Sequence, residues 1–274
     1  MASQAQNEFQ WDQLDERYRV ILCDIWGVVH DGVRLNPGAA QRLAKWREQG
    51  RFVLLVTNAP RTADDVARQL EGMRLPASCY DAIVTGGDVG IAVLKSLGRP
   101  FGFLGTSDDR AVLTGNGVPI SNLGDFADVA CVGLERERPR VEQYAQELER
   151  WEARGVLFHC LNADRVVMHG DVAELCAGAL ADSYEQLGGR VAWYGKPHRA
   201  IYDHALGLAG NPLAGSILAV GDGLRTDMLG AARMGFDAVF VSGGIHAHEP
   251  FPADFALANG LGDWRPLATV TGLA

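Results

Sequence analysis

The chain has 274 residues, of which 47% are hydrophobic and 22% charged, and its formal net charge is −9. This length allows one large or two modest domains, and the acidic balance argues against a nucleic-acid or anionic-membrane surface. The first twenty residues are polar, and no apolar run reaches the ~18 residues of a membrane span. Five scattered cysteines without a C-x-x-C pair fit buried thiols in a reducing compartment, so we expect a soluble cytoplasmic protein.

Apolar runs alternate with amphipathic helical patterns in the first third of the chain, which predicts a parallel sheet covered by helices. Short unbroken apolar runs are typical of central parallel strands, and an Asn-Pro pair is typical of a helix start. In chain order we expect a strand from Val20 that delivers Asp24, a helix from Asn36-Pro37 to Gly50, a strand at 52–56, a helix from Thr62 and a strand at 82–85 that ends at Gly86-Gly87.

The middle of the chain has a different character. A loop-rich stretch precedes an amphipathic helix at 139–154, two short strands and a further helix. From Val191 the alternation returns, with strands expected at 191–194, 216–220 and 238–241 and helices at 201–208 and 227–234. The simplest account is an α/β fold with a doubly wound, Rossmann-like core, residues 15–87 and 187–274, interrupted by an inserted domain at 88–186.

Polar side chains follow the apolar runs at four places. Asp24 ends the first run, Thr57-Asn58 follows the second, Lys196 follows strand 191–194, and Asp222 and Asp227 come after the run at 216–220. Taken singly, each aspartate is most simply a cap or turn residue. Together they predict a phosphoryl-transfer site, because open α/β sheets bind ligands at the carboxyl ends of their strands and three carboxylates suit a hard divalent cation.

These motifs resemble the haloacid dehalogenase superfamily, and specifically its class IIA, which includes 4-nitrophenyl, pyridoxal and sugar phosphatases. The resemblance covers residues 18 to 245. It rests on Gly27-Val28, Gly32, Pro37-Gly38-Ala39, Val56-Thr57-Asn58, Leu161-Asn162-Ala163-Asp164, Cys176 to Leu180, Gly195-Lys196-Pro197-His198 and Gly221 to Asp227. It implies a C2-type α/β cap inserted into the core, which agrees with the insert expected from composition.

The resemblance also implies a mechanism. Asp24 would attack phosphorus to form an aspartyl-phosphate, while Thr57 and Lys196 neutralise the transferring group and Asp227 positions Lys196 or a water. Mg²⁺ would be held by Asp24, the backbone carbonyl of Trp26, Asp222 and Asp227. Asn58, Asn162, Asp164 and His198 are candidate substrate contacts. For Asn162 and Asp164 a turn-forming role is an equal alternative, and for His198 a place in the first turn of a helix.

Trp26 departs from the pattern, because most such phosphatases carry an acid–base aspartate there. General acid–base help is typically worth ~10²–10⁴ in rate. Three explanations stay open. His30 or Asp31 replaces the missing acid, the substrate has a good leaving group such as an activated phosphate or a phosphonate, or the protein binds a phosphorylated ligand with weak catalysis. The Asp222/Asp227 pair argues against the metal-free dehalogenases of the superfamily.

The sequence therefore predicts a Mg²⁺-dependent phosphatase of small phosphorylated metabolites. His246 and His248 lack a third ligand at a credible spacing, so we assign them to a surface loop rather than to a metal site. Relatives of this class often form homodimers through the cap, but the sequence leaves the oligomeric state and the substrate open.

Overall fold

A computed structural model describes residues 9–169, 172–243 and 251–274, so the predicted loop at His246 and His248 lies outside the described residues. The chain divides into two compact units. The first comprises Met1–Leu55, Met73–Ala82 and Ala209–Ala274, and the second Val56–Gly72 and Ile83–Leu208. The predicted α/β fold class with parallel sheets is confirmed. Within the described ranges, no helix has the length and apolar character needed to cross a lipid bilayer.

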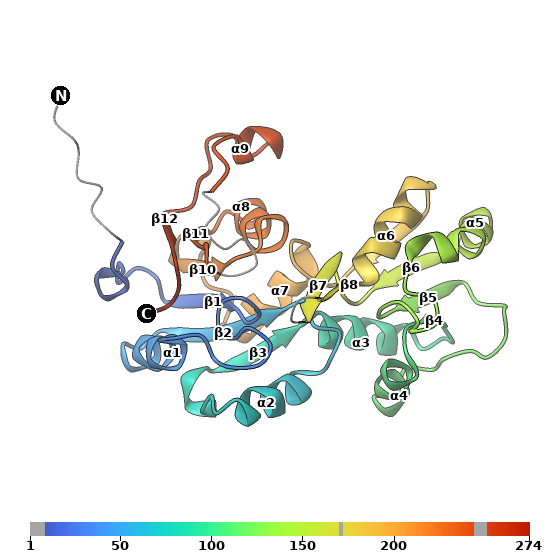
Figure 1. Ribbon diagram of the computed structural model, residues 1–274, viewed down its shortest axis with the longest axis horizontal. Coiled ribbons are helices and arrows are strands. Elements are labelled where there is room, and N and C mark those ends of the chain that lie inside the picture. The colour runs from blue at the N-terminus through green and yellow to red at the C-terminus, as the bar shows by residue number, and fades with distance from the viewer. Residues whose placement is uncertain (1–8, 170–171, 244–250) are drawn as a thin grey trace. The chain divides into compact units, whose positions relative to one another are not determined.

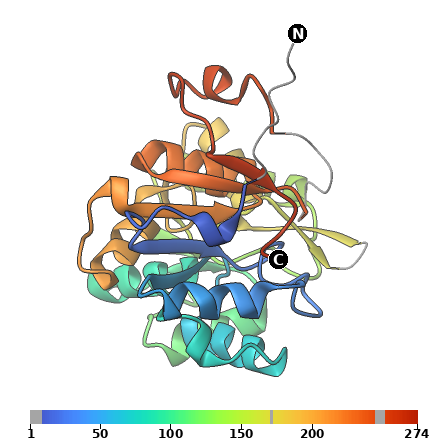
Figure 2. The same cartoon turned by 90° about the vertical axis from the view of Figure 1, so that its left-hand side faces the viewer.

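A six-stranded sheet has the strand order β12-β11-β10-β1-β2-β3 (Figure 1). Both central strands, β1 and β10, are buried along their whole lengths and pair in parallel, with Cys23 opposite Val220. Figure 2 shows β1 in blue beside the orange strand β10, with β11 on the other side of β10. The strands are β1 Val20–Asp24, β2 Phe52–Thr57, β3 Ala82–Thr85, β10 Ile217–Gly221, β11 Asp237–Val241 and β12 Ala268–Val270.

The first unit contains the helices α1, α8 and α9, which span Ala39–Glu48, Leu229–Met234 and Phe255–Ala258. A π-helical turn at Leu224–Met228 leads directly into α8. Helix α1 begins two residues later than predicted, with Gly38 rather than Asn36 as its N-cap. The side chain of Asn36 instead donates hydrogen bonds to the carbonyls of Gly27 and Val28, at 3.0 and 3.1 Å. This residue therefore ties down the loop after β1.

The second unit has a four-stranded parallel sheet, β4-β5-β6-β9, and an antiparallel pair, β7-β8. Helix α6 packs on β6 and β9. The strands are β4 Gly102–Leu104, β5 Asp128–Cys131, β6 Leu157–Cys160, β7 Val166–His169, β8 Val172–Leu175 and β9 Arg190–Trp193. The helices are α2 Ala63–Gly72, α3 Gly86–Leu97, α4 Ser107–Gly115, α5 Ala145–Ala153, α6 Ala177–Gln186 and α7 Arg199–Leu208.

Two elements of the second unit differ from the sequence-based expectation. The strand expected at 191–194 within the core is β9, and it pairs with β6 in the four-stranded sheet. The strand expected at 82–85 is β3, which ends before Gly86-Gly87 as predicted, and Gly86 begins α3, whose cap is the Thr85 hydroxyl. The helix expected at 139–154 is α5 preceded by a 3₁₀ turn, Val141–Tyr144. The predicted insert at 88–186 falls inside the second unit, and its boundaries stay a prediction.

Candidate active site

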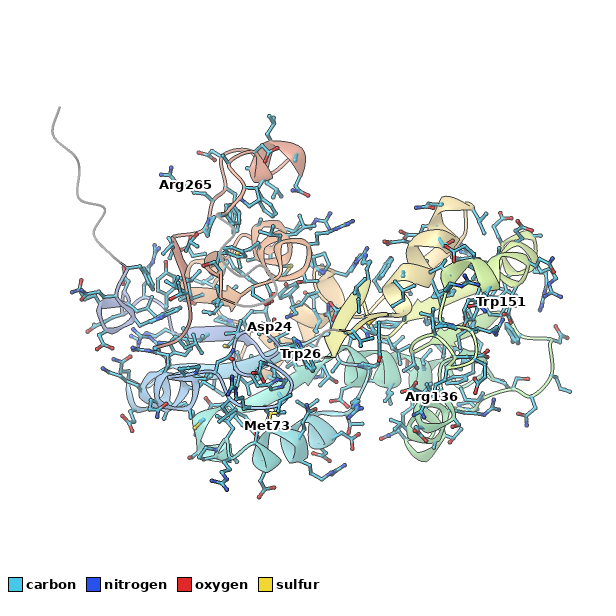
Figure 3. The ribbon with its side chains drawn as sticks, viewed as in Figure 1. Asp24, Trp26, Met73, Arg136, Trp151 and Arg265 are labelled. Atoms are coloured by element: carbon cyan, nitrogen blue, oxygen red, sulfur yellow. The ribbon has the colours of Figure 1, made fainter. Side chains whose placement is uncertain are left out.

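Three carboxylates of the first unit meet at the carboxyl ends of its central strands. Asp24 is the last residue of β1, Asp222 follows β10, and Asp227 lies in the π-helical turn. One oxygen from each lies within 4.8 Å of the others, and all three side chains are buried. Figure 3 labels Asp24 within this unit. The parallel pairing of β1 with β10 brings these residues together, because the carboxyl ends of parallel strands share one edge of the sheet.

Gly27 allows the close approach of Asp222. A Cβ atom on residue 27 would lie 2.0 Å from the Asp222 Oδ2 atom, and the φ angle of Gly27 is +82°. Both constraints demand glycine here. The side-chain amide of Asn36 donates to the Gly27 carbonyl and so helps to hold this loop. From the sequence we interpret Asn36 as a helix cap, because an Asn-Pro pair is typical of a helix start. No other feature of the sequence indicates its role in the loop.

The negative charge of this cluster favours the binding of a cation. Carboxylates held this close repel one another, and burial weakens the screening by water. Asp227 is also oriented by its surroundings, since its Oδ2 atom accepts hydrogen bonds from the Gly223 amide (3.1 Å) and the Thr226 hydroxyl (3.4 Å). A set of carboxylate oxygens of this kind is what Mg²⁺ and similar hard cations prefer. The residues present therefore fit a divalent cation.

The residues nearest Asp24 in sequence occupy a compact loop. The indole of Trp26 is half-buried and meets the His30 ring edge-on, with the ring centroids 5.2 Å apart. His30 is buried, and its Nδ1 atom accepts a hydrogen bond from the Gly32 amide at 2.9 Å. Burial lowers the pKa of His30 and so favours the neutral imidazole.

Asp31, the second candidate for a replacement acid, forms a turn. Its Oδ1 atom accepts hydrogen bonds from the amides of Val33 and Arg34, each at 2.9 Å. These backbone hydrogen bonds lower the pKa of Asp31. A carboxyl group that is stabilised in its charged form is a poorer proton donor, so this environment does not favour Asp31 as an acid.

A second polar cluster lies in the second unit and is organised by Asn58. The Asn58 side chain accepts a hydrogen bond from the Lys196 amide (2.6 Å) and donates to the Lys196 carbonyl (3.1 Å) and to Asp164 Oδ1 (2.8 Å). Lys196 is buried, and its Nζ atom donates to the Val56 carbonyl at 3.0 Å. Thr57 is also buried, and its hydroxyl accepts from the Ala59 amide. Asn58 thus clamps the backbone of the predicted phosphate-binding lysine.

The other candidate substrate contacts are also engaged within the second unit. The Asn162 side chain accepts a hydrogen bond from the Asp164 amide, as in an Asx turn. Burial raises the pKa of Asp164, while the Asn58 hydrogen bond and the charge of Lys196 oppose this shift. The His198 ring stacks on Trp193 with the centroids 4.7 Å apart. The predicted catalytic and substrate-binding roles of these residues stay predictions.

Comparisons with known proteins identify the family. A family model described as haloacid dehalogenase-like hydrolase matches residues 21–119, and a second, HAD-hydrolase-like, matches residues 193–263. A crystal structure of a haloacid dehalogenase-like hydrolase from Brucella suis 1330 is 35% identical, with a TM-score of 0.82 over 96% of this chain and 98% of that one. The chain belongs to the haloacid dehalogenase-like hydrolases. The predicted superfamily and the prediction of a hydrolase are confirmed.

The chain is also similar to two phosphatases. The ribonucleotide monophosphatase NagD of Escherichia coli K12 is 29% identical over 238 residues, which are 82% of this chain and 88% of that protein. The crystal structure of 4-nitrophenylphosphatase from Thermotoga maritima is 22% identical, with a TM-score of 0.72 over 94% of this chain and 95% of that one. At this identity the second likeness concerns the fold alone.

The carboxylate cluster predicts that a divalent cation stabilises this hydrolase. Adding Mg²⁺ or Mn²⁺ at 100 times its dissociation constant should stabilise the fold by about 2.7 kcal/mol, measured as a rise in melting temperature. Asp222→Asn should abolish this rise, whereas Asp263→Asn, which removes an exposed carboxylate elsewhere in the first unit, should keep it. Equal shifts in both variants would mean that the cation binds elsewhere.

The Asn58 clamp predicts a large cost of truncation. Asn58→Ala leaves a buried amide and carbonyl of Lys196 without their partner, so the free energy of unfolding should fall by about 2–4 kcal/mol in chemical denaturation. Asn116→Ala is the matched control, because Asn116 donates only to the Val112 carbonyl within the same unit. We expect a loss below about 1.5 kcal/mol there. A loss no larger for Asn58→Ala would contradict the clamp.

Proposed function

We propose that this hydrolase is a Mg²⁺-dependent phosphatase of small phosphorylated metabolites that works through an aspartyl-phosphate on Asp24. The observation that carries the proposal is the buried cluster of Asp24, Asp222 and Asp227, with their oxygens within 4.8 Å of one another. The activity named for the NagD relative supports a phosphoric monoester hydrolase. We propose the Mg²⁺ ion and the covalent intermediate in addition to this activity.

In this proposal Mg²⁺ is held by the carboxylates of Asp24, Asp222 and Asp227 and by the backbone carbonyl of Trp26. When bound, the cation would offset negative charge on the phosphoryl group. The restriction of residue 27 to glycine supports this assignment, since it lets the Asp222 carboxylate sit directly against the backbone of the loop. Asp227 would keep its orientation through the hydrogen bonds from Gly223 and Thr226.

The reaction that we propose has two steps. A carboxylate oxygen of Asp24 attacks phosphorus and expels the leaving group, and water then cleaves the aspartyl-phosphate and releases phosphate. Thr57 and Lys196 are assigned to the oxygens of the transferring phosphoryl group. The clamp of Asn58 on the Lys196 backbone supports a lysine with a fixed position, which such electrostatic stabilisation requires.

Substrate contacts are assigned to Asn58, Asn162, Asp164 and His198 of the second unit. The substrate is a small phosphorylated metabolite, and the name of the NagD relative makes ribonucleoside monophosphates the first compounds to test. We propose a cytoplasmic enzyme that binds neither nucleic acid nor membrane. Its five cysteines are buried and form no disulfide, which supports a cytoplasmic location. Its net charge of −9 supports the absence of nucleic-acid and membrane binding. A homodimer stays a prediction.

Trp26 favours a second candidate function, the hydrolysis of activated phosphates or phosphonates. An indole cannot protonate a leaving group, and substrates with good leaving groups do not need that proton. Burial lowers the pKa of His30 and so disfavours the protonated imidazole that could donate a proton, which adds to this argument. If the protein turns over no phosphate ester at all, the remaining alternative is a phospho-ligand-binding protein with weak catalysis.

The nucleophile proposal predicts that Asp24→Asn abolishes phosphate release. Phosphate would be measured across nucleoside, sugar, aryl and acyl phosphates with Mg²⁺, and the variant should lose at least 10³-fold in kcat, as expected for the loss of a covalent nucleophile. Asp12→Asn serves as control, because Asp12 pairs with Arg42 and Lys45 near the N-terminus. Retained turnover in Asp24→Asn would refute the covalent mechanism.

A replacement acid–base role for His30 predicts a split between substrate types. His30→Ala should lower kcat on sugar or nucleoside phosphates by ~10²–10⁴ and much less on aryl phosphates, which need little protonation. Steady-state kinetics on both types, with His30→Gln as a polar control of similar size, measures this split. Equal losses on both types would remove His30 as the acid.

A further inference from the structure

The loop after β1 holds Trp26 in one place. The Gly27 amide donates to the His30 carbonyl at 2.8 Å, and the amides of Val29 and His30 both donate to the Ile25 carbonyl, at 2.8 and 3.1 Å. Trp26 itself forms an isolated β-bridge with His30. Because the backbone on both sides of Trp26 is hydrogen-bonded, the side chain leaves the loop in a fixed direction.

Two neighbours then fix the indole ring. The His30 imidazole meets it edge-on, with the ring planes at 74°. On another side the ring rests against Gly32, where a Cβ atom would lie 2.6 Å from Trp26 Cη2. Gly32 has a φ angle of +95°, so its own conformation and the space taken by the indole both require glycine. The loop is therefore shaped to hold a large ring at position 26.

Trp26 is more exposed than the apolar residues around it in the loop. Trp26 is half-buried, whereas the residues around it in the loop, Ile25, Val28, Val29 and His30, are at most 2% exposed. Trp26 follows Asp24 closely in the chain, and both are labelled in Figure 3; a Cβ atom on its neighbour Gly27 would lie 2.0 Å from the Asp222 Oδ2 atom. A rigid aromatic surface next to an acidic cluster is well suited to stack on a planar group.

We propose that Trp26 is a specificity-determining residue that stacks on the leaving group, so that the preferred substrates are phosphates whose leaving group carries an aromatic ring. Aryl and aroyl phosphates are the chemical class that fits. The inference rests on the proposed phosphatase activity and adds to it the identity of the leaving group. The indole, which contributes no proton, contributes binding and selection instead.

The chemistry of this class matches the absence of an acid at position 26. As Asp24 forms its bond to phosphorus, the bond from phosphorus to the leaving oxygen breaks. The electron pair departs with that oxygen as a phenolate or carboxylate, which needs no proton from the enzyme. Water then attacks phosphorus, the Asp24–phosphorus bond breaks, and phosphate leaves with the proton of the water. Asp24 returns to its carboxylate form.

Three acyl phosphates test the stacking: benzoyl, cyclohexanecarbonyl and acetyl phosphate. All three leave as carboxylates of similar acidity, and the first two are of similar size, so the benzoyl-to-cyclohexanecarbonyl ratio of kcat/KM reports aromaticity. Stacking predicts a ratio of roughly 3 to 10 in the wild-type protein. Trp26→Leu should bring the ratio to about 1, and Trp26→Phe should keep most of it.

Gly32→Ala tests the ring position without removing the indole. The added Cβ displaces Trp26, so the ratio should fall as it does in Trp26→Leu. Gly260→Ala is the matched control, because Gly260 also has a positive φ angle, +67°, but has open space around it. This control should keep the wild-type ratio. A ratio that Gly32→Ala leaves unchanged would overturn the assigned position of the ring.

A binding measurement separates this inference from the phosphatase proposal. Phenylphosphonate should bind roughly 3 to 10 times more tightly than cyclohexylphosphonate, measured by calorimetry with Mg²⁺, and Trp26→Leu should remove the difference. Turnover of all three acyl phosphates without aromatic preference would overturn the inference and leave the phosphatase standing. No turnover together with preferential phenylphosphonate binding would overturn the phosphatase and keep the aromatic contact of Trp26.

Discussion

The first unit has to hold three buried carboxylates close together. Asp24, Asp222 and Asp227 bring their oxygens within 4.8 Å of one another, although like charges in a poorly solvated place repel. Three features of the fold hold the carboxylates in place despite this repulsion. They are two central parallel strands, a glycine at position 27 and a π-helical turn that carries Asp227. Single π-helical turns of this kind occur frequently at functional sites. A cation bound at this cluster would be attracted by all three carboxylates and would offset their mutual repulsion.

Trp26 affects the chemistry available at this site without disturbing the arrangement of the carboxylates. The backbone carbonyl of residue 26 is unaffected by the side chain, so a cation site and an indole are compatible. The loop accommodates the ring through Gly32 and the edge of His30, so the large side chain is built into the local structure. The indole itself cannot transfer a proton to a leaving group. A substrate whose leaving group departs as an anion would need no such proton.

In the second unit, the hydrogen bonds of one buried side chain fix the polar residues. Asn58 joins residues from three parts of the chain: its own position after β2, Asp164 in the loop after β6, and the Lys196 backbone after β9. One buried amide thus satisfies an N–H group, a carbonyl and a carboxylate, and so fixes the lysine backbone. The superfamily supplies the reaction type, whereas the side chains of each member select the substrate.

The sequence by itself indicated the candidate functional residues and the strands that precede them. Burial of a parallel strand requires a continuous apolar run, which is visible locally at 20–24 and 217–221. Only the tertiary structure decided which sheet β9 joins, which atoms Asn58 binds and why the pKa of His30 is lowered. The partners of Asn58 lie 106 and 138 residues away, and burial of His30 depends on the whole fold around it. Local spacing carries no record of such contacts, because long-range hydrogen bonds and desolvation arise only when distant segments pack together.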